Sequence, residues 1–235
     1  MVVSTRSKAG GGSENVQKSD GEWQFGPGQQ TESTDTTEED TVSMKAIKAA
    51  GELILKGGKY SLDSADDTIH SNANITISDG EFTLASGDDG IHADSATTIS
   101  GGTIDITESY EGIEGLSIDI TGGETYVSGP TNDGNSALDY NGTGTVTGGI
   151  FIAAGSSGMA ENFGDSSTQG VMMVTVNSQA AGSAVSLSDS SGNELVSWTP
   201  EKEYTSVIIS CPEITTGQEY TLTTGRRYDT DYDGQ

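Results

Sequence analysis

Carboxylate side chains recur in this chain at an interval of 22 residues, each time in nearly the same local sequence. The three phrases are Asp66-Asp67-Thr-Ile-His70, Asp88-Asp89-Gly-Ile-His92 and Tyr110-Glu111-Gly-Ile-Glu114. A fixed period of this size is typical of a solenoid, in which each repeat stacks on the one before. Stacking would turn one acidic pair per repeat into columns of carboxylates, and these columns are the strongest indication of function in the sequence.

Stacked carboxylates repel one another and need a counter-charge. At the ~4.8 Å spacing of neighbouring strands, two carboxylates repel by roughly 1 kcal/mol in water and by about 3–4 kcal/mol at an effective dielectric near 20. The chain has no Lys or Arg between Ser61 and Pro200. Ca²⁺ is therefore the expected cofactor, since it accepts about six to eight oxygen ligands in loose geometry. The candidate ligands, the first four preferred, are Asp88, Asp89, Glu111, Glu114, Asp66, Asp67, Asp139, Asp133 and Asn132.

Two other interpretations of these columns remain open. The carboxylates could form solvated corners, because Asp favours turns through hydrogen bonds to its own backbone. His70 and His92 could stack on the outer face without binding any metal. Zinc is disfavoured, because two histidines with hard oxygen donors make a poor tetrahedral set.

Catalysis is a further alternative, because paired carboxylates carry out glycoside hydrolysis. Asp88-Asp89 with His92 resembles the acidic set of β-helical polygalacturonases. Those enzymes, and pectate lyases, also use Arg or Lys, which the central repeats lack. We therefore expect a noncatalytic protein. The alternatives are a lyase or glycoside hydrolase acting on pectin, and a structural cell-surface adhesin segment stiffened by calcium.

The elements that must position the acidic residues follow the same period. Apolar residues recur at Ile47, Ile69, Ile91, Ile113 and Leu138, and glycines recur at Gly58, Gly80, Gly102, Gly123 and Gly149. Alternating apolar and polar residues flank each glycine, as in half-buried strands. Equivalent positions keep the same residue class at a constant offset, which favours parallel stacking. A coil of this length has a perimeter of roughly 70 Å and encloses a packed core. The sequence thus predicts an all-β protein built on a parallel β-helix.

The repeat occupies only part of the chain. We expect a disordered linker or insertion at residues 1–42, β-helix coils at 43–166, a C-terminal antiparallel β cap at 167–225 and a polar tail at 226–235. The first residues lack the apolar core of a signal peptide. Nothing in them resembles a cap for the β-helix, so either upstream coils are missing or this segment is an insertion between coils. From these residues alone, the chain is either cytoplasmic or a fragment that lacks its secretion signal.

Composition excludes several classes of partner. The formal net charge is −26, so nucleic acid, whose phosphates need cationic side chains, is not expected to bind. No apolar stretch is long enough to insert into a membrane. Cys211 is the only cysteine, which excludes a disulfide framework. We expect a monomer.

The repeat phrases resemble a family of carbohydrate-binding domain-containing proteins, typified by a clostridial cell-surface β-helix protein. The shared phrases include Lys45-Ala-Ile-Lys-Ala49, Asp88-Asp-Gly-Ile-His-Ala93 and Ser109-Tyr-Glu-Gly-Ile-Glu114, and the resemblance spans about residues 44 to 225. One departure is Thr68, which stands where the next repeat has Gly90.

The resemblance implies a right-handed parallel β-helix, bound calcium, an extracellular or cell-surface location, and noncatalytic binding of cellulose or of pectic polysaccharide, particularly acidic galacturonan. It carries the calcium ligands over to Asp88, Asp89, Glu111 and Glu114. Because galacturonan and this chain are both anionic, a Ca²⁺ ion shared between protein and sugar carboxylates is the expected route of contact. Tyr110 and Tyr140 are candidate platforms for a sugar ring.

Overall fold

The computed structural model describes residues 43–225, which form strands and no helix. None of these residues therefore forms a helix able to cross a membrane. The expected linker at residues 1–42 and tail at 226–235 lie outside the described residues. The strands are β1 (Ile47–Ala49), β2 (Leu53–Ser64), β3 (Ile69–Ser71), β4 (Ile75–Ser86), β5 (Asp89–Glu108), β6 (Glu111–Ser128), β7 (Leu138–Val146), β8 (Ile150–Gly155), β9 (Val171–Gln179), β10 (Ala184–Asp189), β11 (Glu194–Trp198), β12 (Tyr204–Ser210) and β13 (Tyr220–Gly225).

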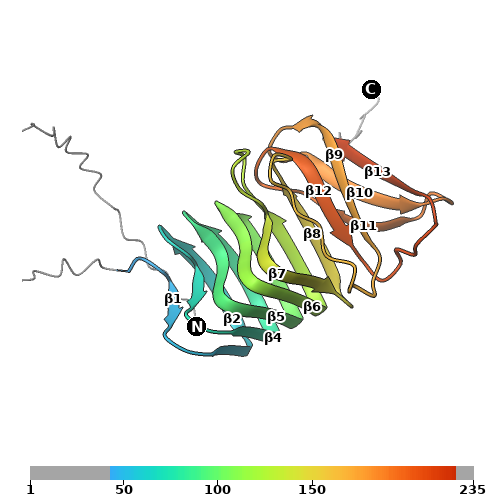
Figure 1. Cartoon of the computed structure of the whole chain (residues 1–235). Coiled ribbons are helices and arrows are strands. Elements are labelled where there is room, and N and C mark those ends of the chain that lie inside the picture. The colour runs from blue at the N-terminus through green and yellow to red at the C-terminus, as the bar shows by residue number, and fades with distance from the viewer. Residues whose placement is uncertain (1–42, 226–235) are drawn as a thin grey trace, which may run out of the picture.

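Strands β1 to β7 form the coils of a parallel β-helix, seen in Figure 1 as a stack running from blue to green. The isoleucine column is in the predicted register: Ile47 pairs with Ile69, Ile69 with Ile91, Ile91 with Ile113, and Ile113 with Leu138. The predicted parallel β-helix is thus confirmed. The constant repeat produces this register because a slip of one residue would turn every inward side chain outward.

The inner face of the coils is a continuous apolar core. Ile69, Ile91 and Ile113 are each 0% exposed, and burying such a side chain stabilises the fold by about 2 kcal/mol. The glycines at the turns have positive φ, for example 87° at Gly102 and 80° at Gly123, a conformation that other residues rarely adopt. Core and turns together hold the acidic corners at a fixed spacing.

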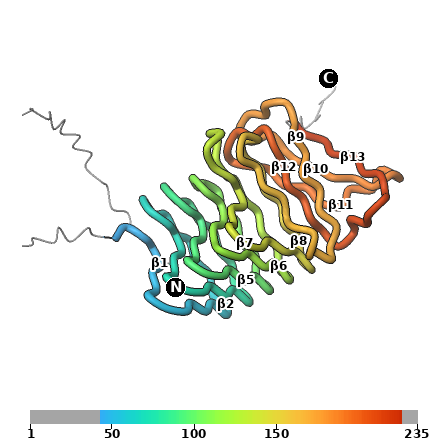
Figure 2. Tube along the Cα trace, viewed as in Figure 1, coloured from blue at the N-terminus to red at the C-terminus, as the bar shows by residue number. Residues whose placement is uncertain are grey.

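A C-terminal unit of antiparallel strands closes the end of the stack, as the orange and red segments of Figure 2 show. Strand β8 pairs in parallel with β6 on one side and antiparallel with β12 on the other. Strand β9 pairs with β12, and a separate sheet has the order β11-β10-β13. The predicted antiparallel unit is confirmed, while its boundary at residue 166 stays a prediction.

Candidate cation site

The acidic residues lie at the corner of the coils that precedes β3, β5 and β6. Asp89 pairs in register with Glu111, and the backbone N–H of Asp89 donates to Asp67 Oδ1 at 3.4 Å. Asp67, Asp89 and Glu111 therefore form one column, called here the acidic column. His70 pairs with His92, His92 with Glu114, and Glu114 with Asp139. These four form the neighbouring histidine column.

Close packing explains the glycine that follows Asp88-Asp89. A Cβ on Gly90 would lie 2.6 Å from the carbonyl oxygen of Gly112 and 2.8 Å from a methyl carbon of Ile106. A side chain therefore does not fit between these coils. Thr68, at the equivalent position one coil earlier, is accommodated because its hydroxyl donates to the carbonyl oxygen of Gly90.

Lys45, on the coil before the acidic column, neutralises its first residues. The ammonium group contacts Asp66 Oδ1 at 2.9 Å and also Asp67 Oδ2. Burial opposes ionisation of Asp66, but the hydrogen bond and charge of Lys45 outweigh it and lower its pKa. Asp67 is 1% exposed and Asp89 is 5% exposed. The interpretation of the acidic pairs as solvated corners therefore does not describe these two residues.

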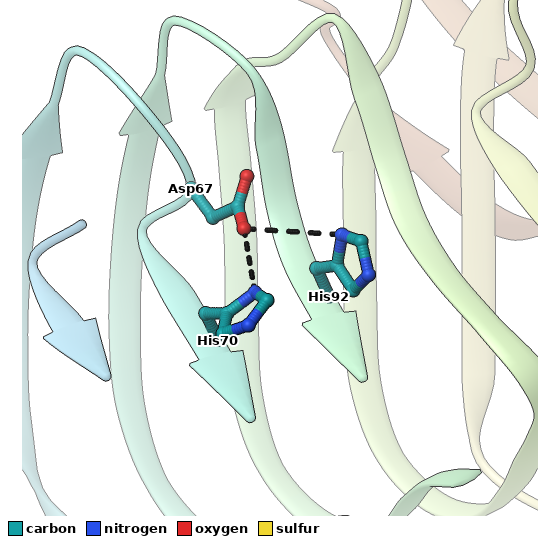
Figure 3. Close-up of side chains that lie close together, drawn as sticks. All are labelled: Asp67, His70 and His92. Atoms are coloured by element: carbon teal, nitrogen blue, oxygen red, sulfur yellow. Dashed lines mark hydrogen bonds and ion pairs between the residues drawn. The ribbon is translucent and has the colours of Figure 1, made fainter. Parts of the chain in front are cut away.

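Two histidines converge on the same carboxylate (Figure 3). Asp67 Oδ2 lies 2.8 Å from Nδ1 of His70 and 3.8 Å from Nδ1 of His92. The two ring centroids are 4.8 Å apart. The imidazoles are neighbours, as expected from their register, but their rings are tilted by 52° and do not stack. Their Nδ1 atoms point at the acidic column rather than away from it.

His92 is surrounded by carboxylates. Its Nδ1 lies 2.9 Å from Asp89 Oδ2 and 2.8 Å from Glu114 Oε2. The hydrogen bond with Asp89, assisted by the charge of Glu114 and opposed by burial, raises the pKa of His92 to about 9. Burial also raises the pKa of Asp89. The protonated imidazole is therefore a counter-charge in the middle of the two columns.

Beyond His92 the carboxylates are poorly compensated. We call Glu111, Glu114, Asp139 and Glu161 the downstream corner, and Lys45, Asp66, Asp67 and His70 the upstream corner. Burial, together with the charges of Asp139 and Glu114, raises the pKa of Glu111 to about 7. Burial and a neighbouring carboxylate also raise the pKa of Asp139 and of Glu161. Among the described residues, no Lys or Arg forms an ion pair with the downstream corner.

Three groups of side chains in residues 43–225 bring possible metal-ligating atoms within 4.8 Å of one another. They are Asp66, Asp67 and Asp88; Asp67, His70 and His92; and Asp89, His92 and Glu114. Glu111, Asp139 and Asp133 are in none of them. Only the first group is all oxygen, and Lys45 already contacts two of its members.

The remaining predicted residues lie apart from these groups. Asn132 Oδ1 accepts a hydrogen bond from the backbone of Gly134 at 2.9 Å, and Asp133 accepts one from the hydroxyl of Ser156. Tyr110 is 49% exposed beside the acidic column. Tyr140 is half-buried against the core, and its hydroxyl donates to the carbonyl oxygen of Asn162 at 2.6 Å. Of the two tyrosines, only Tyr110 is exposed.

Several participants were missed from the sequence. Lys45 precedes the segment between Ser61 and Pro200, in which the sequence has no Lys or Arg. Asn72 and Asp94 contact the outer ring nitrogens of His70 and His92, and both follow their histidine by two residues, a regularity that could have been noticed. Glu161 lies outside the repeat, and no sequence signal connects it with Asp139.

Comparison with known families agrees with the sequence resemblance. A family model described as carbohydrate-binding domain-containing protein matches residues 1–90. That segment includes Lys45, Asp66, Asp67, His70, Asp88 and Asp89, and ends before the downstream corner. No curated protein and no solved structure matches the chain. Up to Gly90, the match confirms the resemblance to the carbohydrate-binding domain-containing family.

Proposed function

We propose that this β-helix is a noncatalytic module that binds acidic plant cell-wall polysaccharide, galacturonan in particular, through bridging Ca²⁺. The family match supports polysaccharide binding in general. The observation that carries the finer proposal is the poorly compensated downstream corner, where His92 contacts only Glu114 and the pKa of Glu111 is raised to about 7 by burial and by neighbouring carboxylates.

Electrostatics favours a divalent cation at this place. Glu111 is repelled by Asp139, Glu114 and Asp88, and Asp139 is in turn repelled by Glu114. A bound cation would remove this repulsion, and hard oxygen donors suit Ca²⁺. Glu111, Glu114, Asp139 and the exposed Asp88 are the residues that would hold it.

Incomplete coordination by the protein favours bridging. Ca²⁺ takes about six to eight oxygens, and no described group of the downstream corner brings three carboxylates within 4.8 Å. Sugar carboxylates and hydroxyls would supply the remaining ligands. Tyr110, exposed on the same side of the coils, offers a ring face against which a sugar could pack.

A raised pKa is also a property of a catalytic acid, and Glu111 has one. The geometry supports binding better, because acidic residues repeat coil after coil and no single pair is set apart. An extracellular or cell-surface location fits the proposal, since calcium-binding modules outside the cell work at roughly 10⁻⁴–10⁻³ M.

The test is retention of the protein on insoluble polygalacturonate. With about 1 mM Ca²⁺ the protein should be retained, and EDTA should release it. Retention that EDTA does not change would contradict cation bridging. The same incubations should release neither reducing ends nor unsaturated uronides, and the appearance of either product would establish catalysis instead.

A further inference from the structure

Two residues of the upstream corner, together with His92 of the next coil, form a donor set of a different kind from the all-oxygen set expected for calcium. Asp67 and His70 come from one coil and His92 from the next. Their nearest ligand atoms lie within 4.8 Å of one another, and Figure 3 shows both rings turned toward the carboxylate. Because β3 and β5 pair in register above a fully buried isoleucine column, this arrangement is held by the backbone of two coils.

The outer nitrogen of each histidine faces an oxygen acceptor. His70 Nε2 lies 3.1 Å from Asn72 Oδ1, and His92 Nε2 lies 3.5 Å from Asp94 Oδ1. Nδ1 of His92 also lies 2.9 Å from Asp89 Oδ2 and 2.8 Å from Glu114 Oε2, so a metal ion would have to displace the proton of this nitrogen. With the remaining proton on Nε2, each ring would present the lone pair of Nδ1 to the ion. Metal-binding histidines in proteins almost always have such a partner, which fixes ring orientation and tautomer.

The spacing of the donor atoms suits a small transition-metal ion. Bonds of ~2.0–2.1 Å in tetrahedral geometry separate neighbouring ligand atoms by about 3.3 Å. The distances from Asp67 Oδ2 to the two Nδ1 atoms, 2.8 and 3.8 Å, lie on either side of that value. Imidazole nitrogen is a good ligand for Zn²⁺ and similar ions and a poor one for Ca²⁺.

Lys45 does not prevent metal binding. It contacts Asp67 Oδ2, which a metal would occupy, but it also contacts Asp66 Oδ1 at 2.9 Å. The ammonium group therefore keeps a carboxylate partner when Asp67 turns to the metal. The carboxylate of Asp67 is 1% exposed. In this low local dielectric, its attraction for a bound cation is stronger than it would be in water.

We infer that Asp67, His70 and His92 form a binding site for a divalent transition-metal ion of the Zn²⁺ class, distinct from the carboxylates proposed to hold Ca²⁺. This site joins two successive coils, and its occupant would stiffen the stack at the start of the acidic column.

The test is titration of the metal-free full chain with Zn²⁺ and with Co²⁺ in the presence of about 1 mM Ca²⁺. The expected result is binding of about one equivalent of Zn²⁺, and a Co²⁺ absorption spectrum of the intensity typical of low-coordinate nitrogen and oxygen ligation. His70→Gln should weaken Zn²⁺ binding at least ~10-fold, and Asn72→Ala by roughly 10-fold, the loss typical of a missing outer partner.

Glu52→Gln is the control, because it removes one carboxylate charge at an exposed position outside the three groups of possible metal ligands. It should change Zn²⁺ affinity by less than about threefold. Thermal melts in EDTA establish that each variant is folded before titration. Absence of Zn²⁺ binding by the wild type would overturn the inference, as would a Zn²⁺ affinity that His70→Gln leaves unchanged. Either of these results would contradict the zinc site without contradicting Ca²⁺-dependent retention on polygalacturonate. The zinc site and the proposed polysaccharide binding can therefore be disproved independently.

Discussion

The upstream and downstream corners occupy equivalent positions of the same repeat, yet their electrostatics differ. In the upstream corner, Lys45 and His70 surround the buried Asp67, and the pKa of Asp66 is lowered by Lys45 despite burial. In the downstream corner, burial and like charges raise the pKa of Glu111 to about 7. One repeat can thus build a stabilising ion-pair network at one end and a repulsive cluster open to an external cation at the other.

The largest effect should come from removing the cation of the upstream corner. Lys45→Met leaves the buried Asp67 with His70 as its main partner, and losing one member of a buried ion pair is strongly destabilising. We expect a loss of about 2–3 kcal/mol, or a fall of roughly 5–10 °C in Tm, measured by thermal denaturation at pH 7.

Lys59→Met is the matched control for that variant. Lys59 pairs with Glu81 at 2.6 Å across the same 22-residue offset, but both side chains are exposed. Exposed pairs contribute little, so Tm should stay unchanged within error. Equal losses in the two variants would contradict the distinction between compensated buried carboxylates and ordinary surface charges.

A second effect concerns pH. The folded-state pKa of Glu111 is raised to about 7 from an ordinary 4.5, and that of His92 is raised to about 9 from 6.5. Both groups bind protons more tightly in the folded state, so the stability they contribute is lost as pH rises. For Glu111 the loss falls between pH 4.5 and 7 and for His92 between 6.5 and 9.

Metal-free protein should therefore lose about 5 °C in Tm between pH 5 and pH 8, after allowance for solvent screening. Calcium should reduce this loss, because a bound cation holds the carboxylates ionised. A Tm that rises with pH in EDTA would contradict the repulsion assigned to the downstream corner.

The smallest effect should have the opposite sign to that of Lys45→Met. Glu111→Gln removes one of several mutually repelling carboxylates, so metal-free protein should gain about 1 kcal/mol at pH 8. At pH 4.5, where Glu111 is largely protonated, the gain should disappear. Chemical denaturation at both pH values measures it, and destabilisation at pH 8 would show that Glu111 is already compensated.

The sequence predicted the fold in detail because a solenoid repeats its constraints. Each inward isoleucine must meet another at a fixed offset, so Ile91 alone implied its partners Ile69 and Ile113. The strand pairing in the C-terminal unit was harder to predict from the sequence. The contact of β12 with β8 joins residues 51 to 59 positions apart, with no repeat to indicate register.

The site was only partly predictable. Stacking placed Asp89 over Glu111, because register follows from the repeat. The role of Lys45 was not foreseen, since the acidic phrase and its cation belong to different coils. The direction of the His70 ring is a rotamer choice, fixed by Asp67 on one side and by Asn72 on the other. The sequence disfavoured zinc because two histidines with hard oxygen donors make a poor tetrahedral set. The convergence of both rings on one carboxylate, seen only in the structure, is the ground for proposing it.

The most direct test of the central claim compares variants of the downstream corner on insoluble polygalacturonate. In about 1 mM Ca²⁺, Glu111→Gln/Asp139→Asn should lose most of its retention. Glu52→Gln/Asp63→Asn, with the same change of charge at exposed positions of the first coils, should be retained like the wild type. Equal retention of the two variants would contradict the assignment of cation bridging to the downstream corner.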